Sequence, residues 1–440
     1  MRKMKDSGIA WIGEIPTNWT TIKFSSFIER MGTGLNPRDN FVLDKESPFY
    51  YVTIRNFKNG KLYLDDNCDR ISQEAFNIIQ ERSQLQAGDF LFASISKEPQ
   101  VFLLNETPCN WNINESVFCI RPKKGIYLTN YLYYLLTDYR FYESLLTDAT
   151  GSTFLSIKQN KLKQSTLVLP PNDEQQKIAS HLDSKCTQID SLIANVQQQI
   201  EKLKAYKQSL ITETVTKGLN PDAPMKDSGI ECIGEIPETW DIAPIMRVSN
   251  LYNGDRSSNY PSGTDIIDEG IPFITSNNLN SIELDTNIST NKFISEEKYN
   301  SLRGAKLKIN DIIFCLRGSV GKCGINYKYT AGTIASSLVC IRAKSILSSY
   351  LNYVLHTSMI VEQAKLEAIG IGSQNLAAED IGRVIILIPS KEEQQEIADY
   401  LDKKCTQIDS LITIKQQKIE KLQQYKKSLI YEYVTGKREV

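Results

Sequence analysis

The sequence predicts an α+β protein: two mixed α/β domains in a pseudo-two-fold tandem repeat, separated by two long helices that form an antiparallel coiled coil. The chain of 440 residues contains two near-copies of one opening motif and two near-copies of one closing segment. The closing segments carry a helical heptad pattern, whereas the stretches before them carry short β-rich runs. A solenoid needs about three units or more, so two units indicate a pseudo-dimer.

The opening motif begins each repeat. It reads "MKDSGIAWIGEIPTNW" from Met4 and "MKDSGIECIGEIPETW" from Met225, so the second copy starts 221 residues after the first. Trp19 and Trp240 occupy equivalent positions in the two copies. We expect both indole rings to pack in a core and not against a partner protein.

The two bodies that follow are expected to be mixed α/β domains. Short β-rich stretches such as residues 89–95 and 311–317 lie among turn clusters, and "LTNYLYYLLTDYRFYESLL" has a helical pattern. The bodies share landmarks, because Asp89 corresponds to Asp311, but their loops differ sharply. A common scaffold with different loops predicts one recognition task performed on two different targets.

The closing segments are expected to be long helices. Each begins with "EQQ", at Glu174 and at Glu393, and runs on without Gly or Pro. Apolar residues recur every seventh position, with a second series four residues later, which is typical of a coiled-coil seam. The seam consists of Leu182, Cys186, Ile189, Ile193, Val196, Ile200, Leu203 and Leu210 in the first copy and of Leu401, Cys405, Ile408, Ile412, Ile419, Leu422 and Leu429 in the second. Lys415 interrupts the second copy.

A narrow apolar stripe on a helix needs a partner that covers it. The other copy matches it in length and pattern, and a closed head-to-tail duplication relates its halves by rotation, so we expect antiparallel pairing. The alternative is that each helix packs only on its own domain.

Composition excludes several classes of protein. No apolar run approaches the roughly 20 residues of a membrane helix, so we expect a cytoplasmic protein. Nine cysteines without a C-x-x-C pair and only two histidines make a disulfide framework or a metal site improbable. The net charge of −1 means that any basic surface for nucleic acid must be local.

The chain carries no recognisable catalytic motif. It has no [DN]-P-P-[FYW] methyltransferase signature, and "RGSVGK" at 317–322 lacks the first Gly and the final Ser or Thr of a phosphate-binding loop. We therefore expect no catalytic residues and no cofactor. Such a chain fits a protein that reads a target better than an enzyme.

The order of these segments resembles the specificity (S) subunit of type I DNA restriction-modification systems. The most specific elements are the two P-x-x-x-EQQ helix starts, at Pro170 and Pro389, and the Gly88-Asp89 strand start. The second domain departs from the family pattern at the latter, with Asn310 in place of glycine.

This resemblance implies a non-catalytic protein with two target-recognition domains, each reading one half of a split, asymmetric site on double-stranded DNA. The helices would hold the domains apart and dock two adenine methyltransferase (M) subunits, to which restriction and motor (R) subunits can add. The assembled complex would then be an adenine methyltransferase and ATP-dependent endonuclease. The expected divisions are 1–165 and 221–385 for the recognition domains and 166–220 and 386–440 for the repeated helices.

Two alternatives remain open at this point. One is a coiled-coil adaptor that scaffolds proteins and has no DNA specificity. The other is the specificity subunit of a related system whose partner is a fused methylase-nuclease polypeptide.

Residues on the differing loops are the candidates for DNA contact. Arg and Lys can bind phosphates or guanine edges, whereas Asn and Gln suit adenine. The candidates are Arg38, Arg55, Lys58, Ser94, Ser96, Lys97 and Lys158 in the first domain and Arg256, Ser276, Asn277, Asn278, Arg317, Ser319, Lys322, Gln374 and Asn375 in the second.

Overall fold

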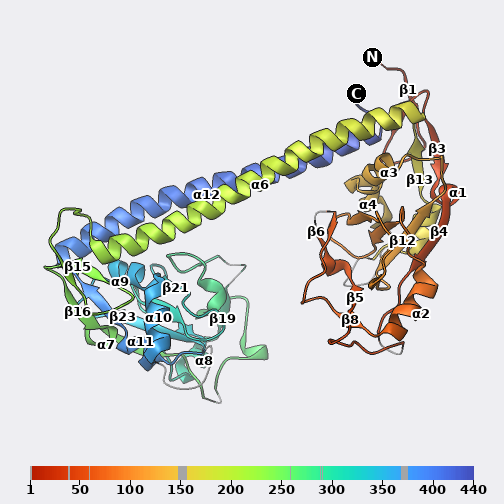
Figure 1. The fold of residues 1–440 in the computed structure, drawn as a ribbon. Helices are drawn as coiled ribbons and strands as arrows, with labels where there is room; N and C mark the ends of the chain where they lie inside the picture. The colour runs from red at the N-terminus through yellow and green to blue at the C-terminus, as the bar shows by residue number, and fades with distance from the viewer. Residues whose placement is uncertain are drawn as a thin grey trace. The chain divides into compact units, whose positions relative to one another are not determined.

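The computed structural model describes the whole chain except residues 1, 38–39, 59, 147–155, 258, 288, 290 and 368–374, and only the backbone of Lys58 and Glu367. The chain divides into two compact units, residues 1–197 with 417–440 and residues 198–416. Each unit contains one α/β body and a part of both long helices, α6 (Asn172–Lys217) and α12 (Lys391–Val434), labelled in Figure 1. The predicted tandem α+β fold is confirmed.

The body of the first unit combines small sheets with short helices. A four-stranded antiparallel sheet has the order β10-β9-β12-β4, a three-stranded sheet has the order β11-β5-β8, and β3 pairs with β13. The opening motif forms the hairpin of β1 and β2, and β6 pairs with β7. The strands are β1 (Met4–Asp6), β2 (Glu14–Pro16), β3 (Thr20–Lys23), β4 (Ile28–Thr33), β5 (Phe49–Val52), β6 (Phe57–Lys58), β7 (Lys61–Leu62), β8 (Arg70–Ile71), β9 (Phe90–Ala93), β10 (Val101–Leu103), β11 (Trp111–Ile113), β12 (Val117–Pro122) and β13 (Thr166–Leu169). The helices are α1 (Phe24–Phe27), the 3-10 turn η1 (Ile54–Asn56), α2 (Gln73–Ser83), α3 (Thr129–Leu136), α4 (Tyr139–Leu146) and α5 (Gln159–Gln164).

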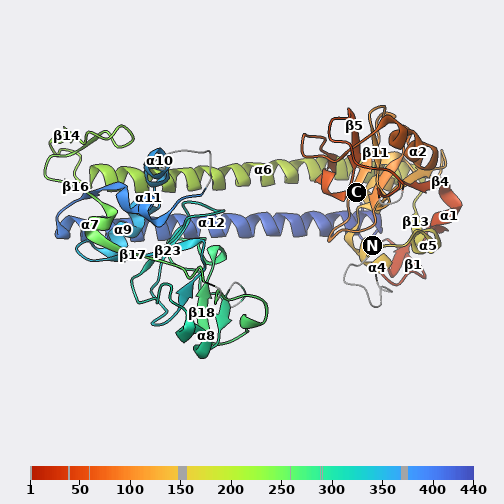
Figure 2. The same ribbon diagram turned by 90° about the horizontal axis from the view of Figure 1, so that it is seen from below.

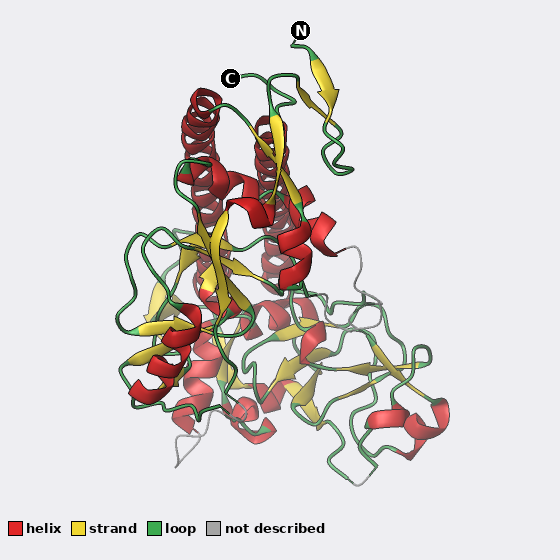
Figure 3. Cartoon of the chain, turned by 90° about the vertical axis from the view of Figure 1, so that its right-hand side faces the viewer, coloured by secondary structure: helices red, strands yellow, loops and turns green. Residues whose placement is uncertain are grey.

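The body of the second unit repeats this arrangement. Its four-stranded sheet has the order β17-β23-β20-β21, its three-stranded sheet has the order β19-β18-β22, and β16 pairs with β24. The strands are β14 (Met225–Asp227), β15 (Glu235–Pro237), β16 (Asp241–Pro244), β17 (Ser249–Asn253), β18 (Ile271–Ile274), β19 (Lys292–Ile294), β20 (Ile312–Cys315), β21 (Cys323–Ile325), β22 (Thr333–Ile334), β23 (Leu338–Ala343) and β24 (Ile385–Ile388). The helices are α7 (Ile245–Val248), η2 (Gly263–Asp265), η3 (Ser276–Asn278), α8 (Glu296–Ser301), α9 (Ser348–Leu355), α10 (Ser358–Glu367) and α11 (Ala378–Arg383). Both bodies mix yellow strands with red helices in Figure 3.

The apolar runs that predicted strands form the centres of the four-stranded sheets. All four residues of β9 are buried, and so are all four of β20. Both faces of these strands are covered, which explains why their sequences are continuous apolar runs and do not alternate with polar residues.

The two long helices pair antiparallel in both units (Figures 1 and 2). In the first unit the His181 ring of α6 lies 4.6 Å from the Tyr433 ring of α12, and Asp190 of α6 accepts Lys426 Nζ at 2.7 Å. The partner numbers fall along α12 as they rise along α6. In the second unit Lys207 Nζ of α6 lies 2.6 Å from an Asp409 oxygen of α12.

The predicted seam faces inward in both units. Leu182, Cys186, Ile189, Val196 and Ile200 of α6 are buried. Leu401, Cys405, Ile408 and Leu429 of α12 are also buried, while Ile193, Leu203, Leu210, Ile412, Ile419 and Leu422 are half-buried. At the predicted interruption, Lys415 Nζ donates to Gln199 Oε1 at 2.6 Å, so a polar contact replaces an apolar one there. The pairing is therefore confirmed in each unit.

The EQQ start of α6 attaches that helix to its own domain. Trp19 Nε1 donates to Glu174 Oε2 at 2.7 Å. The buried Gln175 accepts the backbone N–H of Leu128 at 2.8 Å and donates to the carbonyl of Pro170 at 3.0 Å. Because a buried amide is costly unless its groups are paired, these contacts fix one docking position.

The second copy repeats these contacts at the start of α12. Trp240 Nε1 donates to Glu393 Oε1 at 3.3 Å, and Gln394 joins the backbone N–H of Leu347 at 2.8 Å to the carbonyl of Pro389 at 2.9 Å. Trp19 and Trp240 have no exposed surface, so the expected core packing of both rings is confirmed.

An ion pair between a half-buried arginine and a buried aspartate occurs at each four-stranded sheet. Asp89 accepts Arg121 Nε at 2.7 Å, and Asp311 accepts Arg342 Nε at 2.7 Å. The residue before each aspartate has left-handed backbone, with φ of +89° at Gly88 and +68° at Asn310. Asparagine adopts this region more readily than other side-chain-bearing residues, so the departure from glycine keeps the turn.

A buried carboxyl lies at the start of α4 in the first unit. Asp138 Oδ1 accepts the backbone N–H of Phe141 at 2.9 Å, and among the described residues Oδ2 has no hydrogen-bond partner. Burial raises the pKa of the Asp138 carboxyl to about 6.

We predict that Asp138→Asn raises the thermal midpoint Tm at pH 8. In the unfolded chain an aspartate titrates near pH ~3.9, so between about pH 4 and pH 6 the folded state holds a proton that the unfolded state has lost. Stability present at low pH is therefore lost as pH rises through this window, by about 3 kcal/mol in total. Calorimetry should show the Tm difference between variant and wild type shrinking from pH 8 to pH 4.5, and a constant difference would contradict this.

Candidate nucleic-acid interface

Two short turns with the same hydrogen bonds follow β5 and β18. In the first unit Asn56 Oδ1 accepts the backbone N–H of Thr53 at 2.8 Å and the Thr53 hydroxyl at 3.2 Å. In the second unit Asn278 Oδ1 accepts the same two groups of Thr275, at 2.9 and 3.3 Å. The turns η1 and η3 are therefore one structure built twice.

Each turn presents one exposed side chain that differs between the units. Arg55 and Asn277 both stand directly before the framing asparagine, and both are exposed. Asn278 itself is buried, and its amide also donates to Asn291 Oδ1 at 2.9 Å. Its hydrogen-bonding groups hold the turn, so we leave it out of the interface. Ser276 is half-buried in the same turn.

In the second unit, hydrogen bonds join this turn to the loop after β20. Asn280 Nδ2 donates to the carbonyl of Asn277 at 2.6 Å, and Lys322 Nζ donates to Asn280 Oδ1 at 3.2 Å. Arg317 and Ser319 are exposed on the same loop. Four of the predicted residues therefore belong to one connected surface.

A third segment reaches the same loop. The backbone N–H of Leu376 donates to the carbonyl of Leu316 at 2.9 Å, which brings the exposed Asn375 beside the loop. Gln374, predicted with it, lies outside the described residues.

The first unit brings the corresponding segments together. The backbone N–H of Ile157 donates to the carbonyl of Ser94 at 2.8 Å, so the exposed Lys158 adjoins the loop that carries Ser96 and the exposed Lys97. Ser94 is buried, and its hydroxyl donates to the carbonyl of Ser116, so we leave it out of the interface as well. Arg38 and the side chain of Lys58 lie outside what the structure describes.

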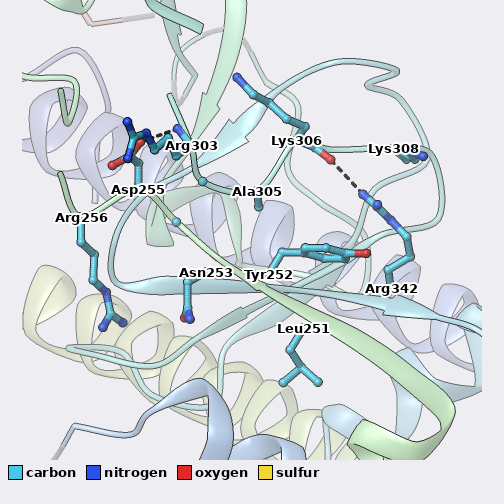
Figure 4. Close-up of a pocket in the computed structure, with 12 residues that line it drawn as sticks. Leu251, Tyr252, Asn253, Asp255, Arg256, Arg303, Ala305, Lys306, Lys308 and Arg342 are labelled. Atoms are coloured by element: carbon cyan, nitrogen blue, oxygen red, sulfur yellow. Dashed lines mark hydrogen bonds between the residues drawn. The ribbon is translucent and has the colours of Figure 1, made fainter. Parts of the chain in front are cut away.

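A basic cleft of about 530 Å³ lies in the second unit, between the end of β17 and the segment after α8 (Figure 4). Of its cationic residues only Arg256 was predicted from the sequence. The cationic side chains that line it are Arg256, Arg303, Lys306, Lys308 and Arg342.

The cleft keeps an excess of positive charge. Asp311 neutralises Arg342, and Asp255 is ionised because hydrogen bonds, first from Ser257 and then from backbone groups, lower the pKa of its carboxyl to about 2. One carboxylate therefore faces four other cations. Arg256, Arg303 and Lys308 are exposed, so their charges can reach a ligand.

The first unit carries neutral residues at two of these positions. Lys308 donates its backbone N–H to Asp311, and Gln86 donates the same group to Asp89. The carbonyls of Lys306 and Gln84 likewise each accept the arginine of the sheet ion pair. The extra charge at these positions thus belongs to one domain and not to the shared scaffold.

The described part of the chain contains no group of three or more His, Cys, Asp or Glu side chains placed to hold a metal ion. None of the described helices is both long enough and apolar enough to cross a lipid bilayer.

Comparison with known protein families shows which family contains this chain. The family model for the type I restriction modification DNA specificity domain matches residues 16–204 and again residues 237–424. This chain belongs to the type I DNA specificity family.

Two specificity subunits are similar to this chain over most of their length. A subunit assigned to the MjaX system of Methanocaldococcus jannaschii is 27% identical, covering 97% of this chain and 95% of the relative. The EcoKI specificity subunit of Escherichia coli strain K12 is 22% identical over 91% of this chain and 84% of its own length. A solved structure from work on complex assembly and conformational transition of the type I restriction-modification system covers 96% of this chain and 99% of its own, with TM-score 0.64 and 15% identity.

Specificity subunits are non-catalytic, in agreement with the expectation from the sequence. The adaptor alternative is not favoured, because the DNA specificity domain matches both halves of the chain. In this chain the glutamate and the first glutamine of each EQQ sequence have a structural role, because they attach each long helix to its own domain.

We predict that Arg303→Gln with Lys308→Gln weakens DNA binding without abolishing it. Each lost phosphate contact makes the negative slope of log K against log salt shallower by about 0.9, so the slope of the double variant should be shallower by about 2. The measurement is titration of DNA with the full chain and its methyltransferase partner at several salt concentrations. Gln86→Lys, at the position in the first unit that corresponds to Lys308, should make the slope of log K against log salt steeper, because it adds a cation that can bind phosphate.

Lys292→Gln is the matched control, because Lys292 is exposed in the second unit but does not line the cleft. An equal effect of Lys292→Gln and Lys308→Gln would show that only overall charge matters.

Proposed function

We propose that this subunit reads a bipartite, asymmetric site on double-stranded DNA, with residues 1–165 and 221–385 as separate recognition domains. The repeated helices, 166–220 and 386–440, join them. The observation that carries this proposal is the pair of turns η1 and η3, which keep one hydrogen-bonded frame and expose different side chains. Two readers on one scaffold fit a site whose two halves differ in sequence.

We further propose that the helices dock two copies of one methyltransferase subunit, which restriction subunits can join. In the first unit Leu192 of α6 is 48% exposed and Tyr425 of α12 is 52% exposed. In the second unit Leu411 of α12 is 48% exposed and Tyr206 of α6 is 56% exposed. Exposed apolar side chains on a helix favour a protein partner, and the same leucine and tyrosine recur in each unit.

The geometry of the helix pair supports one docking patch in each unit. Leu192 stands directly before the seam residue Ile193, and Tyr425 directly before Lys426, which is one heptad after the seam residue Ile419. Equivalent heptad positions put Leu192 and Tyr425 on the same edge of an antiparallel pair. The ion pair between Asp190 and Lys426 places them at the same level. Asp183, on the other edge of α6, instead accepts hydrogen bonds from α3 of the domain. The patch therefore lies on the edge away from this contact with α3.

Replacing residues 21–165 with the corresponding body of another specificity subunit should change one half of the methylated motif and leave the other half unchanged. The reason is that the opening motif and the helices are repeated, whereas the loops of the two bodies are independent. Genome-wide mapping of methylated adenines in cells that carry the hybrid checks this. A change in both halves would count against separate readers.

Glutamate at Leu192 and Tyr425 should reduce the bound methyltransferase from two copies to one, because a charge in each apolar patch costs desolvation. Glutamate at Leu411 and Tyr206 should have the same effect, and all four changes should remove both copies. Native mass spectrometry of the co-purified complex measures the stoichiometry. Val42→Glu is the control, since Val42 is 83% exposed and lies outside the helices. Two copies on the fourfold variant would refute the patches.

A further inference from the structure

We propose that Arg55 and Asn277 are equivalent base-reading residues, Arg55 contacting guanine in one half-site and Asn277 contacting adenine in the other. This inference rests on the proposed function and names one determinant of specificity in each domain. No catalytic role is involved, because each side chain would recognise a base edge and change no bond.

The positions are equivalent because the hydrogen bonds around them are equivalent. In both turns a threonine begins the frame and an asparagine three residues later ends it. The closing amide also binds the segment after the turn: Asn56 Nδ2 donates to the carbonyl of Tyr63 at 3.3 Å, and Asn278 Nδ2 donates to the carbonyl of Asp285 at 3.1 Å. In each turn the asparagine side chain therefore hydrogen-bonds both to the threonine that begins the turn and to the segment that follows it.

Hydrogen bonds before and after each turn hold the frame in one conformation, which favours base reading. A side chain on a loose loop loses conformational freedom on binding, whereas a side chain on a fixed turn loses less. Behind the first turn, Phe57 is buried and its ring lies 6.4 Å from the ring of Phe102. Behind the second, Leu279 is buried. A buried apolar side chain therefore supports each of the two turns.

Arg55 and Asn277 differ in the hydrogen-bonding groups that distinguish one DNA base from another. An arginine guanidinium can donate two hydrogen bonds to O6 and N7 of guanine, and an asparagine amide can bind N6 and N7 of adenine. Among the described residues, neither Arg55 nor Asn277 has a side-chain hydrogen bond or ion pair within the chain. Both are free to bind a ligand.

The surroundings of the tip in the second unit fit contact with a DNA backbone. Lys322 reaches Asn280 beside the turn, and Arg317 is exposed on the same loop. Cations next to a base-reading side chain can hold phosphates and so fix its register on the duplex. On this surface the exposed amide of Asn277 is carried on the turn and can distinguish adenine.

Reciprocal substitution tests the inference. In the complete methyltransferase complex, Arg55→Asn should remove the requirement for one guanine in one half-site, and Asn277→Arg should remove the requirement for one adenine in the other. Selection from a randomised DNA library, followed by sequencing, reads both halves at once. The preference at the affected position should fall by roughly 5- to 150-fold, the discrimination of one bidentate contact.

Alanine variants provide a second test in case Arg55→Asn or Asn277→Arg prevents DNA binding altogether. Arg55→Ala and Asn277→Ala should each relax one position, and Tm should stay at the wild-type value because neither side chain supports the frame. Asn56→Ala and Asn278→Ala should instead lower Tm. A wild-type motif from both alanine variants would overturn the inference. If the wild-type complex selects no bipartite motif, the proposed function has failed, and that result is distinct.

Discussion

A stripe of apolar side chains along a helix is unstable in water until another surface covers it, and this constraint determines how both units are built. Each unit takes the start of one long helix and the end of the other. The seam therefore closes only if both helices carry the same pattern with the same spacing. In each unit the "CTQIDSLI" stretch of one helix lies against the last turns of the other helix, as the pairs Asp190–Lys426 and Asp409–Lys207 show.

The polar contacts at the seam are reciprocal. Lys207 pairs with Asp409 in one unit, and Lys426 pairs with Asp190 in the other. The lysines are 17% and 29% exposed, so each stem is largely covered while its ammonium reaches a carboxylate. A charged residue at a seam position fixes register at some cost in stability. Each ion pair uses one residue from each helix, so the same register is fixed in both units.

The scaffold is held by buried groups that the two domains share, and the differences lie at its edges. The Asp89–Arg121 and Asp311–Arg342 pairs and the Trp–Glu contacts recur with the same partners. Losing one partner of such a pair leaves a buried charge unpaired. Substitution is therefore tolerated mainly at the exposed residues of the turns η1 and η3 and in the cleft. At two cleft positions the second domain has lysine and the first has glutamine.

Much of the fold could be predicted from the sequence because its signals are periodic. The heptads predicted the helices and their pairing, and the apolar runs predicted β9 and β20. Asn278 was misleading, since "TSNN" reads as a polar loop until the shared Thr-x-x-Asn spacing with Thr53 and Asn56 is noticed.

The cleft could not be predicted from one segment. Tertiary packing brings Arg256, Arg303 and Lys308 to one cleft, although Arg256 lies far from the other two in the sequence. Alignment of the two halves at Asp89 and Asp311 could have shown the lysines as a difference between domains.

One chain with two unlike readers should specify one split DNA sequence. The decisive experiment is genome-wide mapping of methylated adenines in cells with the gene intact and in cells with the gene deleted. We expect a motif with two different defined halves and an unspecified spacer, lost completely on deletion and restored by the wild-type chain. Methylation that is unchanged on deletion, or a lost motif that is continuous or symmetric, would rule out two unlike readers on this chain.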